Sequence, residues 1–183
     1  IAERPGRVGG GTRGLQFVDG RSPAQLEAWR FLARANRDSR GPSALAEFLG
    51  TTKGTTSQTL IALESKGYLR RLRGTRDKRS VMLELTPAGQ ALLERDPLRV
   101  LDDVVARMSS RERDTISGGL RRLLRDVQSY VGGAGFGICE ACSLFSAEGA
   151  VGEHDGPHRC GLTSEPVNHG EAHQICVDYQ ASR

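Results

Sequence analysis

The hydrophobic period of this chain changes at Gly67, and that change limits the folds it can adopt. From Ser22 to Lys66 the apolar residues recur at helical spacing, whereas after Gly67 they occur in two short runs typical of strands. Two short helices joined by a tight glycine turn and followed by a hairpin are the order of elements in a winged helix-turn-helix. We therefore predict a mainly α fold with a small β-hairpin wing, of the α+β class.

Three helices are predicted before the hairpin, over residues 22–40, 43–49 and 53–66. Ser22 and Ser43 are the expected N-caps of the first two, and glycine-containing turns separate the three segments. The residues expected to face inward are Leu26, Trp29, Phe31, Leu32, Ala33, Leu45, Ala46, Leu49, Leu60, Ile61 and Leu63.

The hairpin is predicted from strands at 68–72 and 81–85, with a densely charged loop between them as the wing. A helix is then expected from Thr86-Pro87 to Arg95, followed by amphipathic helices at 98–108 and 110–131. Ser109 and Glu112 have the spacing of a capping box that opens the last helix.

The wing and the third helix hold the residues expected to contact DNA. Between positions 53 and 80 there are eight basic residues and two acidic ones, and clustered cations release counterions from closely spaced phosphates. The small hydroxyls and the amide of the third helix are expected on its exposed side, where such groups reach base edges or phosphates. The predicted contacts are Lys53, Thr55, Thr56, Ser57, Gln58, Arg73, Arg76, Asp77, Lys78 and Arg79.

The segment from Leu45 to Gly89 resembles the MarR family of winged-helix regulators. Its matching motifs are Ala46-Glu47-Phe48-Leu49, Leu63 to Arg71, Asp77-Lys78-Arg79-Ser80, and Leu85-Thr86-Pro87-Ala88-Gly89. The resemblance implies that Asp77 orients Arg79 at the wing tip, and that Arg79 contacts the minor groove or a phosphate. It also implies a homodimer in which the 110–131 helix takes part. The family usually has a long dimerisation helix before this segment, where this chain has the Gly/Arg-rich residues 1–21. Either that helix lies outside this sequence or dimerisation rests on the C-terminal helices.

The chain ends in a region with the opposite charge and all four cysteines. Residues 1–136 have 24 basic and 15 acidic side chains, whereas residues 137–183 have 2 basic and 7 acidic ones. This division suits a nucleic-acid binder with a separate module that does not touch phosphates. The cysteines, Cys139, Cys142, Cys160 and Cys176, have the spacing C-x2-C-x17-C-x15-C, and four thiolates can hold either zinc or an iron-sulfur cluster.

The dispersed third and fourth cysteines favour a 4Fe-4S cluster over zinc, because a cluster is wider than one ion. The tail also looks like the small iron-sulfur domains related to high-potential iron-sulfur proteins, through its C-x2-C pair, Cys160-Gly161-Leu162-Thr163, and Cys176 followed by Tyr179. A zinc site could instead recruit His158 or His173, and Cys139 with Cys142 could form a thiol-redox pair.

We thus expect four parts: a flexible arm at 1–21, a winged helix at 22–96, dimerisation helices at 97–131 and a metal-binding tail at 132–183. The expected protein is a cytoplasmic, non-enzymatic regulator, most simply a repressor, that binds double-stranded DNA under the control of an iron-sulfur centre. A repressor responding to a small organic effector, with a structural zinc in the tail, is the alternative, and a thiol or electron-transfer protein is a third. No apolar run long enough to span a membrane occurs.

Overall fold

The computed structural model describes residues 21–74, 79–131, 135–147 and 156–181. In these ranges helices predominate, and the strands form three small antiparallel sheets, so the mainly α, α+β prediction is confirmed for the part described. No helix in these ranges is both long and apolar enough to cross a membrane. The predicted arm lies almost entirely outside the described residues.

Helix α2 (Pro23–Arg34) opens the winged helix, with the Ser22 side chain accepting a hydrogen bond from the backbone of Gln25. Its inner face buries Leu26, Ala28, Trp29, Phe31 and Leu32, while Ala33 is half-buried. The helix ends six residues earlier than predicted, because Ala35 is extended and pairs with Ile175 of the tail. A single turn of 3-10 helix, η1 (Arg37–Ser39), lies between the end of α2 and the next helix.

The helix-turn-helix consists of α3 (Pro42–Phe48) and α4 (Lys53–Ser65). Gly50, in the turn, has a φ of 59°, which glycine adopts without strain. The predicted N-cap of α3 is wrong: Gly41 takes the N-cap position, with Pro42 as the first helical residue. Ser43 therefore lies inside the helix, where it is exposed.

Helix α4 packs through one face, at the helical spacing of Thr56, Thr59, Leu60 and Leu63. Ile61, predicted to be inside, is 49% exposed, because it lies a quarter turn away from Leu60. The three helices share a core with Leu69, Leu83 and Leu85 of the hairpin.

Strands β1 (Leu69–Arg73) and β2 (Val81–Leu85) form the wing, with Leu69 opposite Leu85 and Arg73 opposite Val81. Beyond the ladder, the backbone N–H of Gly74 donates to Ser80, and residues 75–78 lie outside the description. The predicted hairpin is thus confirmed with a shift of one residue at the first strand.

The chain after the wing forms α5 (Pro87–Ala91) and the 3-10 turn η2 (Leu93–Arg95), where a single helix to Arg95 was predicted. Gly89 lets α5 approach the wing, because an added Cβ would lie 2.1 Å from the carbonyl oxygen of Tyr68. The indole N–H of Trp29 donates to the Gly89 carbonyl at 2.8 Å, which joins α5 to α2.

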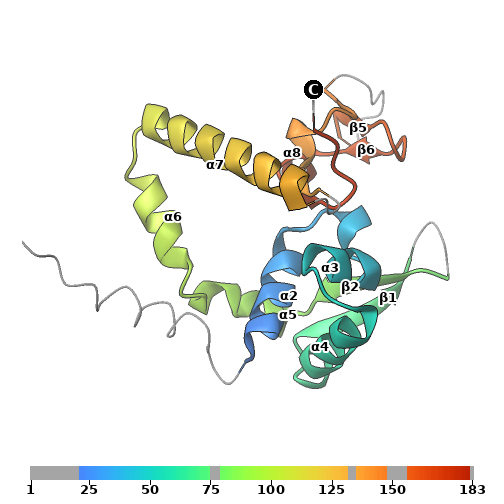
Figure 1. Ribbon diagram of the computed structural model, residues 1–183. Coiled ribbons are helices and arrows are strands. Elements are labelled where there is room, and N and C mark those ends of the chain that lie inside the picture. The colour runs from blue at the N-terminus through green and yellow to red at the C-terminus, as the bar shows by residue number, and fades with distance from the viewer. Residues whose placement is uncertain (1–20, 75–78, 132–134, 148–155, 182–183) are drawn as a thin grey trace, which may run out of the picture.

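Helix α6 (Arg99–Ala106) then leads away from the winged helix, and α7 (Ser110–Val131) runs back toward the tail, as Figure 1 shows. The capping box is confirmed: the Ser109 hydroxyl accepts from the Glu112 N–H, and the Glu112 carboxylate accepts from the Ser109 N–H. None of the described side chains of either helix is buried.

The tail is built from very short elements around a hollow. They are β3 (Gly137–Ile138), η3 (Cys139–Ala141), β4 (Phe145–Ser146), β5 (His158–Cys160), β6 (Pro166–Val167), α8 (His169–Ala172) and β7 (Ile175–Cys176). Strand β3 pairs with β7, and β4, β5 and β6 form a second antiparallel sheet. In Figure 1 the tail lies over α3, at the end of α7.

Candidate DNA-binding surface and metal centre

The outer face of α4 presents a short polar surface. Lys53, Thr55 and Gln58 are exposed, and Ser57 is half-buried. The Thr52 hydroxyl caps the helix by accepting from the Thr55 N–H at 3.1 Å, which fixes the first turn. This face carries side chains that can donate to phosphates and to base edges.

Thr56 does not belong to that surface, although the sequence placed it there. Its side chain is 1% exposed, and Thr59, also expected outside, is 8% exposed. Both lie on the same buried face of α4 as Leu60 and Leu63. Their position on the helix, and not the polarity of the hydroxyl group, therefore decides their burial. Thr56 is removed from the expected contacts.

The wing contributes Arg73 and Arg79, which are both exposed. The predicted contacts Arg76, Asp77 and Lys78 lie outside the described residues. Two other arginines of the hairpin already have acidic partners, because Arg70 forms an ion pair with Glu84 and Arg71 one with Glu64. The local excess of positive charge available to a phosphate is therefore smaller than the sequence count.

The four cysteines of the tail line one cavity of about 40 Å³. Cys139 begins η3, Cys142 follows it, and Cys160 and Cys176 end β5 and β7. All four are free thiols. The other lining residues are the apolar Leu144, Phe145, Leu162 and Val167 and the polar or charged Asn36, Arg37, Asp38, Thr163, Glu171 and Asp178. The thiols therefore meet a wall of mixed character. Short strands thus gather cysteines that are far apart in the sequence.

Several N–H groups point at these sulfur atoms. The side-chain amide of Asn36 donates to Cys139 Sγ at 3.1 Å, and the backbone N–H of Gln180 donates to Cys142 Sγ at 3.4 Å. The backbone N–H of Asp178 donates to Cys176. Such donors stabilise negative charge on sulfur, which is the form that ligates metals.

Cys139 and Cys176 are close enough to share a hydrogen bond. Donation from the Cys139 thiol lowers the pKa of Cys176 to about 6, against the opposing effect of burial. The same hydrogen bond, together with burial, raises the pKa of Cys139 above its ordinary value. The shared hydrogen bond therefore favours the loss of a first proton from the pair over its loss from an isolated cysteine.

The sulfur atoms surround the cavity rather than meeting at a point. In the described residues, no group of three or more His, Cys, Asp or Glu side chains is gathered tightly enough to hold a metal ion. Tetrahedral zinc needs sulfur atoms about 2.3 Å from one centre. The cavity, however, has about three times the ~10–15 Å³ that one water needs. Two of the sulfur atoms, those of Cys139 and Cys176, nevertheless lie within hydrogen-bond distance of each other. The lining therefore identifies four candidate ligands and does not by itself select the group that they hold.

The described histidines do not line this cavity. His158 Nε2 lies 3.2 Å from His169 Nδ1, and His173 Nδ1 lies 3.1 Å from a carboxylate oxygen of Glu140. The prediction that zinc could recruit His158 or His173 therefore finds no support in the geometry. His154 lies outside the described residues.

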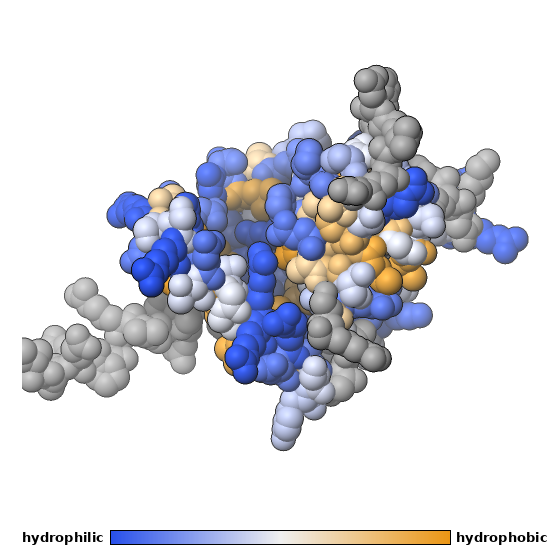
Figure 2. Space-filling view, turned by 90° about the horizontal axis from the view of Figure 1, so that it is seen from above, coloured by the Kyte–Doolittle hydropathy of each residue, from blue (hydrophilic) through white to orange (hydrophobic). Residues whose placement is uncertain are grey.

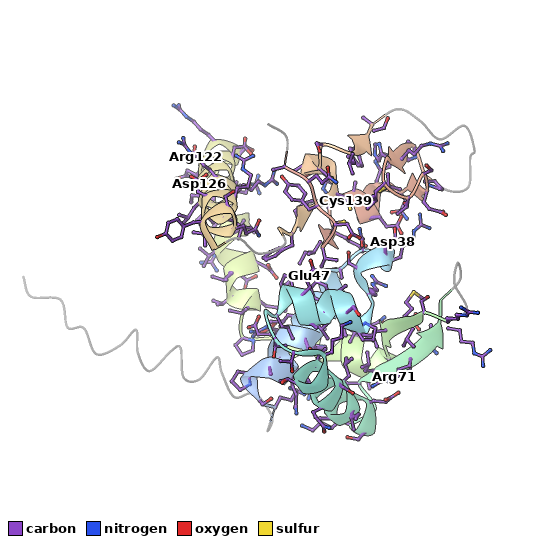
Figure 3. All side chains as sticks on the ribbon, turned by 45° about the vertical axis from the view of Figure 1, so that its right-hand side comes forward. Asp38, Glu47, Arg71, Arg122, Asp126 and Cys139 are labelled. Carbon is purple, nitrogen blue, oxygen red and sulfur yellow. The ribbon has the colours of Figure 1, made fainter. Side chains whose placement is uncertain are left out.

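The tail is joined to the winged helix by residues that the sequence did not single out. Asn36 and Ser39, both buried, hydrogen-bond with tail residues more than 100 positions away. Figure 3 shows Cys139 and Asp38 close together at this junction, with Arg71 of the wing well away from it. No short-range sequence pattern predicts these contacts, because the two residues of each contact meet only when the chain has folded.

The order helix, turn, helix and hairpin defines a winged-helix fold. The family model described as MarR family matches residues 35–81, from the end of α2 to the start of β2. The winged-helix segment of this chain is therefore similar to the MarR family.

A protein of Thauera aromatica named “Putative transcriptional regulatory protein for hcr operon” is 36% identical over 94 residues, which are 50% of this chain. The chain spans 57% of the length of that relative. The solved structure of Streptococcus pneumoniae FabT in complex with DNA is 25% identical, with 64% of this chain and 84% of that chain covered and a TM-score of 0.46. A MarR transcriptional regulator from Methanosarcina mazei Go1 is 21% identical, covering 67% and 86%, with a TM-score of 0.48.

Proposed function

We propose that this protein is a homodimeric transcriptional regulator whose affinity for double-stranded DNA is set by a metal centre bound to Cys139, Cys142, Cys160 and Cys176. A 4Fe-4S cluster is the favoured centre. The observation that carries the proposal is that all four thiols line one cavity, directly against the first helices of a MarR-type winged helix.

The DNA-binding part of the proposal rests on α4 and the wing. Lys53, Thr55 and Gln58 would enter the major groove with α4, while Arg73 and Arg79 would follow the backbone or the minor groove. Ser57, being half-buried, would contact a phosphate at most. Positive charge concentrated in residues 1–136 supports binding by this part of the chain and not by the anionic tail.

The dimer is supported by an uncovered apolar stripe. On α7, Ile116, Leu120, Leu123 and Val127 recur at helical spacing and are 47–59% exposed. Helix α6 adds Val100, Leu101, Val104 and Val105, all of them exposed. Contiguous apolar surface of this kind marks an interface, and a second copy of this chain is the occupant we propose. A Leu120→Lys change should therefore convert the dimer to a monomer in sedimentation velocity, and DNA binding should weaken with it.

The metal part of the proposal rests on the thiols and their donors. A cluster would supply a centre whose charge responds to oxidation or to iron supply. The chain itself would provide four thiolate ligands, with N–H donors from Asn36, Asp178 and Gln180 stabilising their charge. In the view from above, hydrophobic surface of the described residues gathers mainly on the right-hand side (Figure 2). Within the cavity, Leu144, Phe145, Leu162 and Val167 supply apolar lining that would partly shield a centre from water.

The test begins with anaerobic purification of the full chain. We expect a coloured protein with broad visible absorption, near four iron and four sulfide per chain, and DNA binding that changes when the metal is removed. Colourless protein with one zinc per chain would overturn the cluster. DNA affinity that is the same with and without metal would overturn regulation by the centre.

A second candidate is a regulator that binds a small organic effector and uses zinc as a staple. The hydrogen bond between Cys139 and Cys176 is the observation in favour of its zinc, because two sulfur ligands of one zinc ion lie that close together. It predicts that a hydrophobic small molecule, and not metal loss, releases the DNA.

A further inference from the structure

Residues 35–40, which we call the joint, lie between α2 and α3 and hydrogen-bond with the tail. The Asn36 backbone N–H donates to the Ile175 carbonyl at 2.9 Å. The Val177 N–H donates to the Ser39 hydroxyl at 3.1 Å. Ala35 also pairs with Ile175 in a parallel bridge. The joint therefore binds both sides of Cys176.

The same six residues also hold the wing. The Leu83 N–H of β2 donates to the Arg40 carbonyl at 2.7 Å. Within the joint, the Arg40 side chain donates to the Ala35 carbonyl at 2.9 Å. Leu83 is fully buried in the core of the winged helix. A shift of the joint would thus pull on β2 and on the start of α3, the helix that supports α4.

Asn36 connects these two sets of contacts through one side chain. Its Oδ1 accepts from the Ser39 N–H at 2.8 Å and caps η1, while its Nδ2 donates to Cys139 Sγ at 3.1 Å. The residue is 8% exposed, so both hydrogen bonds are protected from water. Replacing one partner leaves a buried polar group unsatisfied, which is costly.

We propose that Asn36 is a positioning residue that transmits the state of the metal centre to the DNA-binding surface within one chain. This inference rests on the proposed function. A centre in the cavity fixes Cys139 and Cys176, the Asn36 amide holds the joint against them, and the joint fixes β2 and α3. Loss of the centre releases Cys139 and lets the joint move, which changes how the wing sits relative to α4.

The experiment compares Asn36→Ser with Asn168→Ser in the full-length dimer. Asn168 caps α8 by accepting from the Glu171 N–H at 2.9 Å, just as Asn36 caps η1. Serine is about as good an N-cap as asparagine, so both variants keep their cap. The shorter serine hydroxyl does not reach a sulfur atom, so Asn36→Ser removes the amide donor selectively. The probes are a DNA duplex selected from a random-sequence pool for binding to the parent protein, protein loaded with iron and sulfide, and the metal-free protein.

For the parent protein we expect loaded and metal-free forms to differ in Kd by about 5- to 150-fold, the usual range of allosteric coupling. Asn36→Ser should bring this ratio to about 1, whereas Asn168→Ser should leave it as in the parent protein. Two readouts are independent of DNA. Metal loading should slow amide exchange at Leu83 in the parent and not in Asn36→Ser, and the midpoint potential of the cluster should fall when the amide donor is lost.

The outcomes separate the two proposals. An equal Kd for the loaded and metal-free parent protein overturns the proposed function itself. A clear ratio in the parent that persists in Asn36→Ser overturns the role of Asn36 and leaves the proposed function intact. If Asn36→Ser does not retain metal, Ser39→Ala decides, because it removes the acceptor for Val177 without touching a cysteine. A ratio that persists in Ser39→Ala overturns the inference, and a ratio near 1 supports it.

Discussion

The winged helix and the tail are two regions held together in different ways. The winged helix surrounds a continuous core of Trp29, Phe31, Leu45, Leu60, Leu63 and Leu83, each at most 2% exposed. In the tail, strands of two or three residues frame a cavity lined by thiols. The buried hydrophobic residues of the tail are Cys139, Val167, Ala172 and Val177. Two strands this short form only when something else fixes them.

From this difference we predict that the tail depends on a bound group and that the winged helix does not. Apolar burial supplies the driving force for the winged helix at about 25 cal/mol per Å² removed from water. The tail buries little apolar surface of its own, so we expect binding of its metal and its folding to be one process. Each of the following changes tests one side of this contrast, in decreasing order of expected effect.

The largest effect should come from Cys139→Ser. Loss of one of four thiolate ligands should lower metal affinity by more than about 100-fold, beyond the 10- to 100-fold that residues outside the ligand set contribute. The tail should become sensitive to limited proteolysis while the winged helix keeps its helical circular dichroism. Ser143→Ala, an exposed change in the same loop, is the control and should bind metal normally. Full metal content in Cys139→Ser would show that Cys139 is not a ligand.

The next effect should come from the buried ion pair that ties α2 to the segment before α6. Arg30 and Asp96 are joined by two hydrogen bonds of 2.9 and 2.7 Å. Asp96→Asn removes the buried carboxylate and leaves Arg30 with only the more exposed Glu27, so it should lower the free energy of unfolding by about 3–5 kcal/mol. Glu27→Gln, which removes a more exposed partner 3.4 Å from Arg30, is the control and should cost less than about 1 kcal/mol.

The effect of Asp96→Asn should depend on pH. Burial alone raises the pKa of Asp96, but hydrogen bonds from Arg30 and Leu98 and the charge of Arg30 outweigh it, so the pKa is lowered. The folded pKa then lies below the unfolded one, so the stabilisation is present above the ordinary aspartate pKa of about 4 and is lost as the pH falls through the folded value. Urea unfolding from pH 7 to pH 3 should show the two proteins converging on the acid side. A constant difference would contradict this account.

Leu60→Ala should test the apolar core, with Ile61→Ala as its neighbour control. Leu60 is fully buried, and its truncation should cost about 2–5 kcal/mol in thermal or urea unfolding. Ile61 is half-exposed, so its truncation should cost less than about 0.5 kcal/mol. Neither variant should lose metal from the tail. Metal loss in Leu60→Ala would show that the tail depends on the core of the winged helix.

The smallest effect should come from Arg37→Ala at the edge of the junction. Arg37 forms an ion pair with Glu171 at 3.4 Å and donates to the Pro166 carbonyl, but its side chain is 43% exposed. Exposed pairs of this kind contribute about 0.2–1 kcal/mol. We expect a change within that range in the docking of the tail, measured by amide exchange in β6. A loss larger than 1 kcal/mol would mean that docking depends on the rim rather than on the buried contacts of Asn36.

Local signals were sufficient for much of the winged helix. Helix α7 begins and ends where its capping box and periodicity predicted, because both signals lie within a few residues of the helix. The hairpin was found within one residue for the same reason. The buried position of Thr56 was missed because a threonine on the inner face of a helix looks polar in sequence, while its methyl group suits a core.

The sequence by itself determined the order of the elements, the four-thiolate composition of the tail and the division of charge between the two regions. The tertiary structure decided where α2 ends, which cysteine meets which donor, and that the tail rests on the joint. Those features depend on residues such as Asn36 and Cys139, which are 103 positions apart and meet at 3.1 Å. Propensity and periodicity act over one or two turns of chain, so they carry no information about a contact that only folding creates.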